Sequence, residues 1–273
     1  AIQLMTRQYV DPIVISNVCG DQNNMSEPEQ VAMIKLLIDR KVDFDVPDQN
    51  NNYPLHKVCG INNKLTESKQ QLEVIKLLIN QGIGVKKHIN KLNNTSTPLQ
   101  VVCCGNLKSM DKLEAIKFLI DNGAQVENDD KRGYQPIQMI CDSNVTCQME
   151  GGDRLEAIKL LINKGAGATI DKKNIARGNY PIHYVCGRKN NFKSNQQLEA
   201  IKLLVEKSVN LNVPDDEGWY PIDYLISDQN NLISKDQLEA INLLLNQNII
   251  FNENTVRGKK RPLEYLCGPL NHM

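Results

Sequence analysis

The sequence has few aromatic residues, no excess of charge of either sign and no long hydrophobic run. Only 5% of its 273 residues are aromatic, with a single Trp, so a stacking platform for single-stranded nucleic acid is not expected. Lys+Arg and Asp+Glu both number 32, and this balance gives no general attraction to a phosphate backbone or an anionic membrane. No stretch approaches the roughly 18 apolar residues of a membrane-spanning helix. We therefore expect neither nucleic acid nor a membrane as a partner.

Motifs of catalysis and of cofactor binding are also missing. The sequence contains no GxGxxG after a strand-like run and no GxxxxGK[ST], the usual phosphate-binding loops. Its eight Cys include no pair with the C-x2-C spacing that zinc sites favour. His88 and His272 are isolated in the sequence. We expect no cofactor, no metal site and no catalytic residue, and hence no enzyme activity.

The chain does contain two blocks that recur about every 41 residues. The first starts with Pro and has Cys, or Ile in one copy, five residues later. Its copies begin at Pro54, Pro98, Pro136, Pro181, Pro221 and Pro262, and an earlier copy has Val14 in the Pro position. The second reads LEAIKLLI or a close variant, with anchors at Lys35, Lys76, Lys117, Lys159, Lys202 and Asn242. Two independent anchors with matching periods indicate a repeat array.

Both blocks have the periodicity of helices. In the second block, Leu72, Ile75 and Ile79 lie on one apolar stripe. In the first block, Pro suits the first turn of a helix. Gly, Asn and Asp clusters such as residues 46–52 and 128–133 separate the second block from the next Pro and indicate turns. The predicted unit is a short helix, a loop, a longer helix and a hairpin-like connection, and such helix pairs bury their apolar faces by stacking.

These motifs resemble the ankyrin repeat. The segment from Thr97 to Leu99, and the Tyr-Pro-Leu-His segment that ends at His56, are similar to the start of the first ankyrin helix, and Asn122-Gly-Ala124 is similar to the end of the second. The resemblance covers about residues 14–268. It implies an all-α fold with short β-hairpin-like connections, an ankyrin-type helical repeat solenoid.

We expect a single array over residues 1–273. It would consist of about six helix-pair repeats and a C-terminal half repeat, with residues 1–13 as an N-terminal cap. The period is longer than the 33 residues of the family, and the excess lies mainly between the two helices of a repeat. Each repeat is therefore expected to have an extended helix-to-helix loop, as in residues 60–69. A HEAT-type repeat of 40 to 47 residues is the alternative fold.

Six of the Cys share one register in the repeats, which predicts small, buried packing residues. They are Cys19, Cys59, Cys103, Cys141, Cys186 and Cys267. Because thiols in a packing register suggest a reducing compartment, we expect a cytoplasmic, intracellular protein. Cys104 and Cys147 lie outside this register and are the candidates for exposed, oxidisable thiols.

One polar position recurs two residues after the Pro. His56 and His183 occupy it in two repeats, and in the ankyrin family this His forms a backbone hydrogen bond that braces the next connection. In other repeats the position holds Gln100, Gln138, Asp223 and Glu264, which could do related work. A structural role is therefore expected for His56 and His183.

The resemblance implies that a protein partner binds the concave face, built from the tips of the connections and the exposed side of the first helices. The family's contact positions, two, four and five residues before each Pro, give these candidates: Asn52, Lys131, Arg132, Tyr134, Arg177, Asn179, Asp216, Glu217, Trp219 and Lys260. Tyr134 and Trp219 stand out because interface hot spots favour large aromatics. For Trp219 the alternative is packing against a neighbouring connection, with Tyr220 or Tyr180.

The predicted function is a non-catalytic protein–protein interaction module, which we expect to be a monomer. The chain opens without an initiator Met or the apolar core of a secretory signal, so we expect a fragment or a processed product. One alternative is therefore a structural or regulatory arm of a larger protein, whose effector domain lies outside this chain. The other is a thiol-dependent enzyme that uses Cys104 or Cys147.

Overall fold

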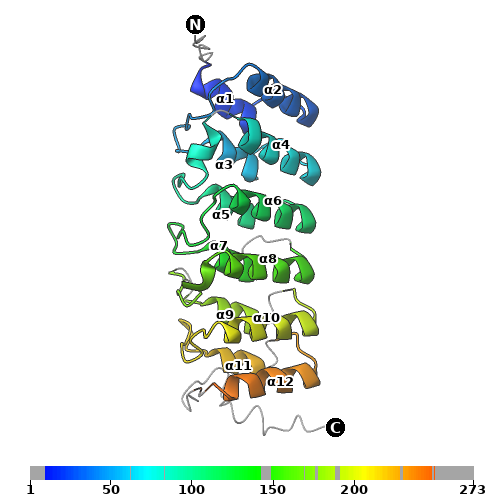
Figure 1. Ribbon diagram of the computed structural model, residues 1–273, viewed down its shortest axis with the longest axis vertical. Coiled ribbons are helices and arrows are strands. Elements are labelled where there is room, and N and C mark those ends of the chain that lie inside the picture. The colour runs from blue at the N-terminus through cyan, green and yellow to red at the C-terminus, as the bar shows by residue number, and fades with distance from the viewer. Residues whose placement is uncertain are drawn as a thin grey trace. The chain divides into compact units, whose positions relative to one another are not determined.

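The computed structural model describes residues 10–61, 63–82, 84–142, 149–168, 170–175, 178–187, 191–227, 230–247 and 249. Within these ranges the elements are twelve α-helices and two short 3-10 helices, and Asp43 is in an isolated β-bridge. The predicted all-α fold class is confirmed (Figure 1). The chain divides into two compact units, Ala1–Lys131 with Thr146–Met149, and Arg132–Val145 with Glu150–Met273.

Unit 1 contains three helix pairs. Its elements are α1 (Pro12–Cys19), α2 (Glu27–Asp39), α3 (Pro54–Cys59), α4 (Ser68–Gln81), η1 (Val85–His88), α5 (Pro98–Cys104) and α6 (Ser109–Asp121). The first helices α1, α3 and α5 pack in one row, and the second helices α2, α4 and α6 pack in another (Figure 1). Each first helix also contacts the second helix of its own pair.

Unit 2 repeats this arrangement. Its elements are α7 (Pro136–Cys141), α8 (Gly151–Asn163), η2 (Ala166–Ala168), α9 (Pro181–Cys186), α10 (Ser194–Glu206), α11 (Pro221–Ile226) and α12 (Ser234–Leu245). The first helices α7, α9 and α11 form one row, and α8, α10 and α12 form the other. The half repeat predicted around Pro262, and residues 1–9 of the predicted cap, lie outside the described residues. The single array over residues 1–273 stays a prediction.

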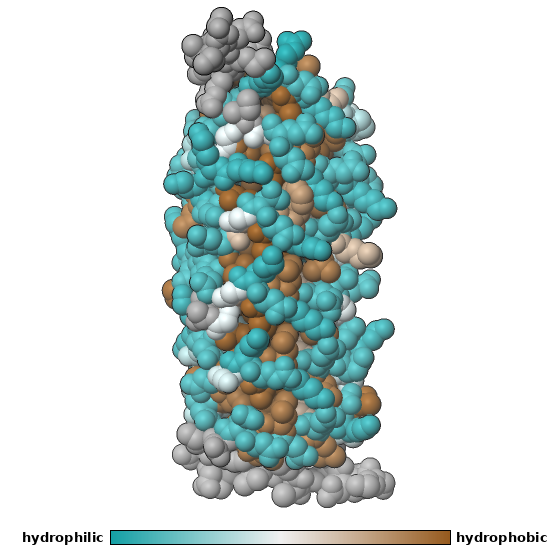
Figure 2. All heavy atoms as spheres, viewed as in Figure 1, coloured by the Kyte–Doolittle hydropathy of each residue, from teal (hydrophilic) through white to brown (hydrophobic). Residues whose placement is uncertain are grey.

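The core follows the two predicted stripes. Cys19, Cys59, Cys103, Cys141 and Cys186 are all fully buried, which confirms the packing role of this register for the described residues. On α4 the stripe residues Leu72, Ile75 and Ile79 are buried as well. In Figure 2, hydrophobic residues gather in a band in each unit, with hydrophilic residues on both sides of it.

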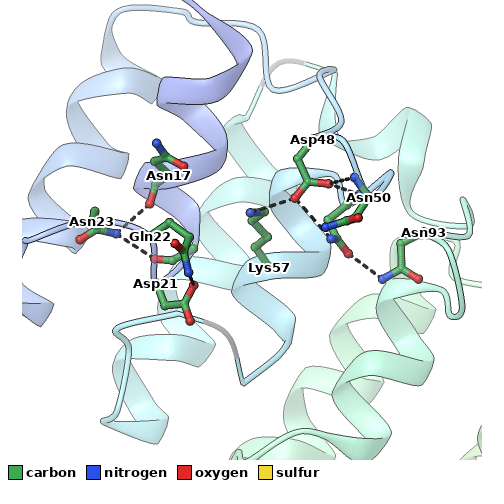
Figure 3. A network of polar contacts seen from close by, with 10 residues as sticks. Asn17, Asp21, Gln22, Asn23, Asp48, Asn50, Lys57 and Asn93 are labelled. Carbon is green, nitrogen blue, oxygen red and sulfur yellow. Dashed lines mark hydrogen bonds and ion pairs between the residues drawn. The ribbon is translucent and has the colours of Figure 1, made fainter.

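The long helix-to-helix loops have a specific role at the ends of the first helices. A helix of six to eight residues leaves its last four carbonyls without partners in the helix. Asn23 of the first loop donates from Nδ2 to the carbonyls of Asn17 and Gly20 (Figure 3), and its Oδ1 accepts from the Met25 amide. Asn63 and Asn230 make the same two kinds of bond in their loops. The loop is therefore a side-chain cap for the helix before it.

A polar side chain of each second helix, buried in every case except the half-buried Gln237, completes this cap. Gln71 donates from Nε2 to the carbonyls of Val58 and Gly60, at 2.7 and 2.8 Å. The residues in this register are Gln30, Gln71, Lys112, Arg154, Gln197 and Gln237, and each donates to a carbonyl at the end of its own first helix. Hydrogen bonds of this kind each contribute about 1 kcal/mol, and a buried carbonyl without a partner costs more.

The expectation of an extended loop in every repeat is wrong for one repeat. Residues 20–26, 60–67, 187–193 and 227–233 join their helices as expected, but only residues 105–108 separate α5 from α6. This shorter loop has no Asn three residues after Gly105, and Lys112 supplies the donor at 2.7 Å from the Gly105 carbonyl.

Candidate functional site

The candidate partner-binding residues lie on the connections that lead from each second helix to the next first helix. We call these connections fingers. In unit 1 the first finger holds Asn52, which is half-buried, and the third holds Lys131, which is exposed. The Lys131 amide donates to the Thr95 carbonyl at 3.1 Å, and Asn93 Nδ2 donates to Asn52 Oδ1 at 2.7 Å. Neighbouring fingers of unit 1 are thus hydrogen-bonded to each other.

Asp48 fixes the shape of the first finger. Its carboxylate accepts from the amides of Asn50 and Asn52 at 2.8 and 2.9 Å, and forms an ion pair with Lys57 of α3 at 2.9 Å (Figure 3). Burial alone would raise the pKa of Asp48, but the hydrogen bonds from Lys57, Asn52 and Asn50 outweigh it and lower this pKa. The finger is therefore held both to itself and to the helix that follows.

Unit 1 presents uncharged side chains at the tips of its first two fingers. Asn51 Nδ2 donates to Asn94 Oδ1 at 3.0 Å across the two fingers. The exposed side chains at these tips are Gln49, Asn50, Asn51, Asn94 and Thr95. Each amide side chain offers both donors and an acceptor, so this surface is suited to hydrogen bonding with a partner rather than to charge pairing.

Unit 2 exposes some of its candidates and buries others. Arg132, Asp216 and Glu217 are exposed and Asn179 is half-buried. Tyr134 and Trp219, by contrast, are only 3% and 8% exposed. Neither aromatic side chain is therefore presented to solvent in the way that a direct contact with a partner would need. Arg177 and Lys260 lie outside the described residues.

Tyr134 is buried and contacts a side chain of the following repeat. It shares a hydrogen bond with Tyr184 of α9, and burial followed by the nearby charge of Asp142 raises the pKa of Tyr184. The guanidinium of Arg132 lies over the Tyr134 ring, 5.4 Å from its centroid. The exposed group at this finger is thus Arg132, and the aromatic ring lies beneath it.

Trp219 packs within its own repeat. Its ring lies 5.0 Å from the ring of Tyr224 on α11. Asp215 accepts from the Trp219 amide at 2.9 Å and from the Tyr224 hydroxyl at 2.6 Å, which fixes both residues. The packing alternative for Trp219 therefore describes the structure, with Tyr224 as the neighbouring ring instead of Tyr220 or Tyr180.

The fingers of unit 2 also approach one another closely. Lys173 and Asp216 form an ion pair at 2.6 Å, and the hydrogen bond that Lys173 donates to Asp216 raises the pKa of Lys173. A Cβ atom at Gly178 would collide with the Asp216 carboxylate, and the φ of Gly178 is +67°. Glycine is needed here on both counts.

The recurrent polar position two residues after the Pro braces the next finger, as expected. His56 Nε2 lies 2.9 Å from the Lys91 carbonyl, and His183 Nε2 lies 3.0 Å from the Val213 carbonyl. The equivalent bonds of Gln100 and Gln138 are 2.7 and 2.6 Å long. Burial lowers the pKa of both His residues to about 4, so they are neutral at pH 7.

Asp223 occupies the same polar position, and its carboxylate accepts from the Tyr220 amide at 2.8 Å. Most of the finger that it would brace lies outside the described residues. Burial, with a contribution from Asp215, raises the pKa of Asp223 to about 6. His88 is not isolated, because it pairs with Asp45 and stacks on Tyr53 with ring centroids 3.9 Å apart. Glu264 and His272 lie outside the described residues.

The chemistry-bearing thiols are mostly buried. Burial raises the pKa of Cys19 to about 12 and raises those of Cys59 and Cys186 as well, which opposes the thiolate form that a nucleophile needs. Cys104 is half-buried, and Cys147 lies outside the described residues.

Among the described residues, no group of three His, Cys, Asp or Glu side chains is placed to hold a metal ion. In the part of the chain that the structure describes, no helix combines the length and apolar character needed to cross a membrane.

The Lys and Glu residues of the second helices pair both within and between repeats. Lys159 contacts Glu156 on its own helix and Glu199 on α10, both at 2.8 Å. Pairs of the second kind also join Lys76 to Glu114 and Lys202 to Glu239. Exposed pairs contribute at most about 1 kcal/mol each.

Reasoning from the sequence missed Ile175. It lies in the finger between α8 and α9 and its side chain is 77% exposed. The family's contact positions pass over it because it lies six residues before Pro181. Its position could have indicated exposure, because Ile175 lies in a turn-rich segment, whereas the hydrophobic residues of the two repeated blocks follow the apolar stripes of the helices.

Comparison with known proteins supports the repeat assignment. The family model described as "Ankyrin repeats (3 copies)" matches residues 25–130, and the model described as "Ankyrin repeat" matches residues 177–216. Together they cover just over half of the chain. The comparison with curated proteins found no match.

Solved structures are similar in fold. An ankyrin repeat domain from Acinetobacter baumannii aligns with a TM-score of 0.57 and 14% identity, covering 88% of this chain and 100% of that one. The human ASB11 ankyrin repeat domain aligns with a TM-score of 0.55 and 16% identity, covering 92% of this chain and 90% of that one. At these identities the likeness concerns the fold alone.

Proposed function

Because the chain belongs to the ankyrin repeat family, we propose that it is a non-catalytic module that binds a protein partner through its finger tips and the exposed side of its first helices. Ankyrin repeats generally bind proteins. The proposal rests on a difference between the buried and the exposed polar residues. Buried His, Gln and Asn side chains hold the backbone of the fingers and helix ends, whereas the finger tips present exposed side chains on backbone that is hydrogen-bonded from finger to finger.

The exposed chemistry of the finger tips differs between the two units. Unit 1 offers the amides of Asn50 and Asn94 at its tips, and unit 2 offers Arg132, Asp216 and Glu217. Complementary polar and charged groups on a partner would provide specificity. We further propose that the protein acts as a monomer in a reducing, cytoplasmic environment, since five Cys of the packing register are buried as free thiols.

A quantitative pull-down tests this function. The baits are the wild-type chain, a fingertip variant (Asn50→Ala/Asn94→Ala/Arg132→Ala) and a matched control. The control, Lys35→Ala/Lys117→Ala, changes exposed residues of second helices. We expect a protein that binds the wild type and the control to be lost from the fingertip variant, with unchanged circular dichroism. Equal retention by all three baits would place binding elsewhere and contradict the proposal.

A further inference from the structure

Apolar side chains are exposed along one side of α12, the last helix that the structure describes (Figure 1). Leu238 and Leu245 are 61% and 40% exposed, and Ile241 between them is buried. These residues have the spacing i, i+3 and i+7 of one helix stripe, and an apolar stripe of this kind normally packs against another element. Asn242 is exposed beside it. We call Leu238, Asn242 and Leu245 the outer face of α12.

The outer face is turned away from α10. Glu239 of α12 pairs with Lys202 of α10, and Asp236 of α12 accepts a hydrogen bond from the Ser194 hydroxyl of α10. The side of α12 that carries these two carboxylates therefore faces α10. Because an α-helix turns about 100° per residue, Leu238 and Leu245 both lie about half a turn around the helix from Asp236.

In other second helices the two Leu positions of this face are buried beneath a further second helix. On α10 they are Leu198 and Val205, which are only 7% and 8% exposed, and α12 packs on this helix. The corresponding buried residues are Leu72 and Ile79 of α4, which packs on α6, and Leu155 and Ile162 of α8, which packs on α10. The element that covers this stripe within the repeats is thus another helix of the same kind.

The covering helices share the side chains that they bury. Each has an Ala and, four residues later, a Leu, and both are fully buried: Ala115 and Leu119 of α6, Ala200 and Leu204 of α10, Ala240 and Leu244 of α12. A small side chain at the contact lets two helix axes approach closely. The Glu before each Ala pairs with a Lys of the preceding second helix, as in Lys76–Glu114, Lys159–Glu199 and Lys202–Glu239. On α12 that Lys position holds Asn242, and the exposed Lys235 lies two turns earlier on the same side.

A second copy of this chain is poorly matched to the outer face. In α6, α8, α10 and α12 the Ala of the covering side is already buried. The corresponding residue is Val74 in α4, which is buried too, and Met33 in α2, which is 36% exposed. Among the described second helices, a second copy could therefore offer only the long Met33 side chain, which would hold two helices further apart.

We propose that the outer face of α12 docks an amphipathic α-helix of a different protein. The docked helix lies beside α12 as α12 lies beside α10, and it places an Ala, and a Leu four residues later, against Leu238 and Leu245. This surface belongs to the row of second helices. It is therefore separate from the finger tips and first helices of the proposed function.

A helical peptide built from the covering sequence tests the proposal. The probe is a fluorescein-labelled peptide with the α10 sequence Ser194–Glu206, held helical by a hydrocarbon staple in place of Leu198 and Lys202. The staple leaves Ala200 and Leu204 free, because Leu198 and Ala200 lie about 200° apart around the helix. A control peptide carries Ala200→Arg, which blocks close approach. Fluorescence anisotropy with the full chain should show at least tenfold tighter binding of the first peptide.

Substitutions in the chain place the binding on the outer face. Leu238→Ser/Leu245→Ser should weaken the peptide about tenfold or more, since the apolar area that it buries is lost. The matched control, Leu92→Ser/Met110→Ser, changes two exposed apolar residues of unit 1 and should leave the affinity unchanged. Circular dichroism should be the same for all of these chains, because the replaced side chains are exposed.

Asn242→Lys tests the orientation of the docked helix. It restores the Lys that the other second helices use, so it should tighten the peptide about two- to fivefold, the effect of an exposed ion pair. A peptide with Glu199→Gln should show no such gain. Equal gains for both peptides would contradict the proposed register.

The proposal is overturned if the wild-type chain does not bind the peptide, as would be found if a segment of this chain covered the outer face. It is also overturned if Leu238→Ser/Leu245→Ser binds as the wild type does. Sedimentation of the wild type as a dimer that these two substitutions convert to a monomer would assign the face to a second copy and overturn it as well. The fingertip variant Asn50→Ala/Asn94→Ala/Arg132→Ala should bind the peptide normally, so failure here and failure of the proposed function are distinguishable.

Discussion

The buried His residues should make the stability of this protein depend on pH between 6.5 and 4. Burial lowers the pKa of His56 and of His183 from 6.5 to about 4. Because the folded-state pKa is lowered, the unfolded chain binds protons more readily than the folded one in this range. The stability is complete above pH 6.5 and falls as the pH falls toward 4. At pH 5 the loss is about 2 kcal/mol for each His.

The chain itself provides the matched substitution. Gln100 and Gln138 occupy the equivalent position and donate from Nε2 to a finger carbonyl, as the two His residues do. His56→Gln/His183→Gln should therefore keep the brace and remove the titration. Urea unfolding followed by circular dichroism at pH 7.5, 6 and 5 measures the free energy of unfolding. We expect wild type and variant to be within about 1 kcal/mol of each other at pH 7.5, the value of one ordinary hydrogen bond, and the variant to be the more stable by several kcal/mol at pH 5.

The difference between the two proteins isolates the His contribution. Asp223 acts in the opposite direction, because its raised folded-state pKa adds stability as the pH falls through about 6, but it is common to both chains and cancels. The reverse double variant, Gln100→His/Gln138→His, should steepen the loss between pH 6.5 and 5. Parallel pH profiles for the wild type and the His-to-Gln variant would refute the reasoning.

Three other substitutions probe the same structure. Asp223→Asn should raise the free energy of unfolding at pH 8 by about 1–3 kcal/mol, because the raised pKa of the Asp223 carboxyl costs stability wherever that group is ionised. It should leave the free energy of unfolding unchanged at pH 4, since Asn keeps an acceptor for the Tyr220 amide. A lower free energy of unfolding at pH 8 would contradict this. Trp219, the single Trp, should show blue-shifted emission and slow acrylamide quenching in the native chain, and Trp219→Ala should cost about 3–5 kcal/mol by urea unfolding; emission typical of an exposed indole would contradict its burial. Lys112→Gln should cost about 1–3 kcal/mol, measured in the same way, although Gln is the commoner residue in this register; unchanged stability would show that the Lys is not needed.

The helix pairs could be predicted from the sequence because their signals are local and repeated. Pro at the first helical position, the Cys register and the LEAIKLLI stripe each occur many times at a steady spacing, so errors in one copy are corrected by the others. The brace formed by His56 was predictable in the same way, through its resemblance to a family position. These features depend on contacts within one repeat or with the next finger.

The orientation of the finger side chains was not predictable in this way. Tyr134 and Trp219 occupy the same position before a Pro, and both are buried. Tyr134 is hydrogen-bonded to Tyr184 of the next repeat, whereas the Trp219 ring lies beside Tyr224 of its own repeat. Position within the repeat therefore indicates where the backbone lies, but the exposure of a side chain also depends on neighbours that differ from repeat to repeat.

The helix-end carbonyls connect the long loops to the unusual Lys112. Where the loop contains the Asn cap, as with Asn63, the carbonyls of the first helix receive donors both from this Asn and from the Gln of the second helix. Where the loop is shortened to residues 105–108, that Asn is missing, and the Gln is replaced by a side chain with three donors that lies near two carbonyls. Arg154 occupies the same register after the longer connection of residues 142–150, so a side chain with more donors than Gln also occurs without a shortened loop. The carbonyls at the end of each first helix are therefore satisfied by different combinations of donors from the loop and from the second helix.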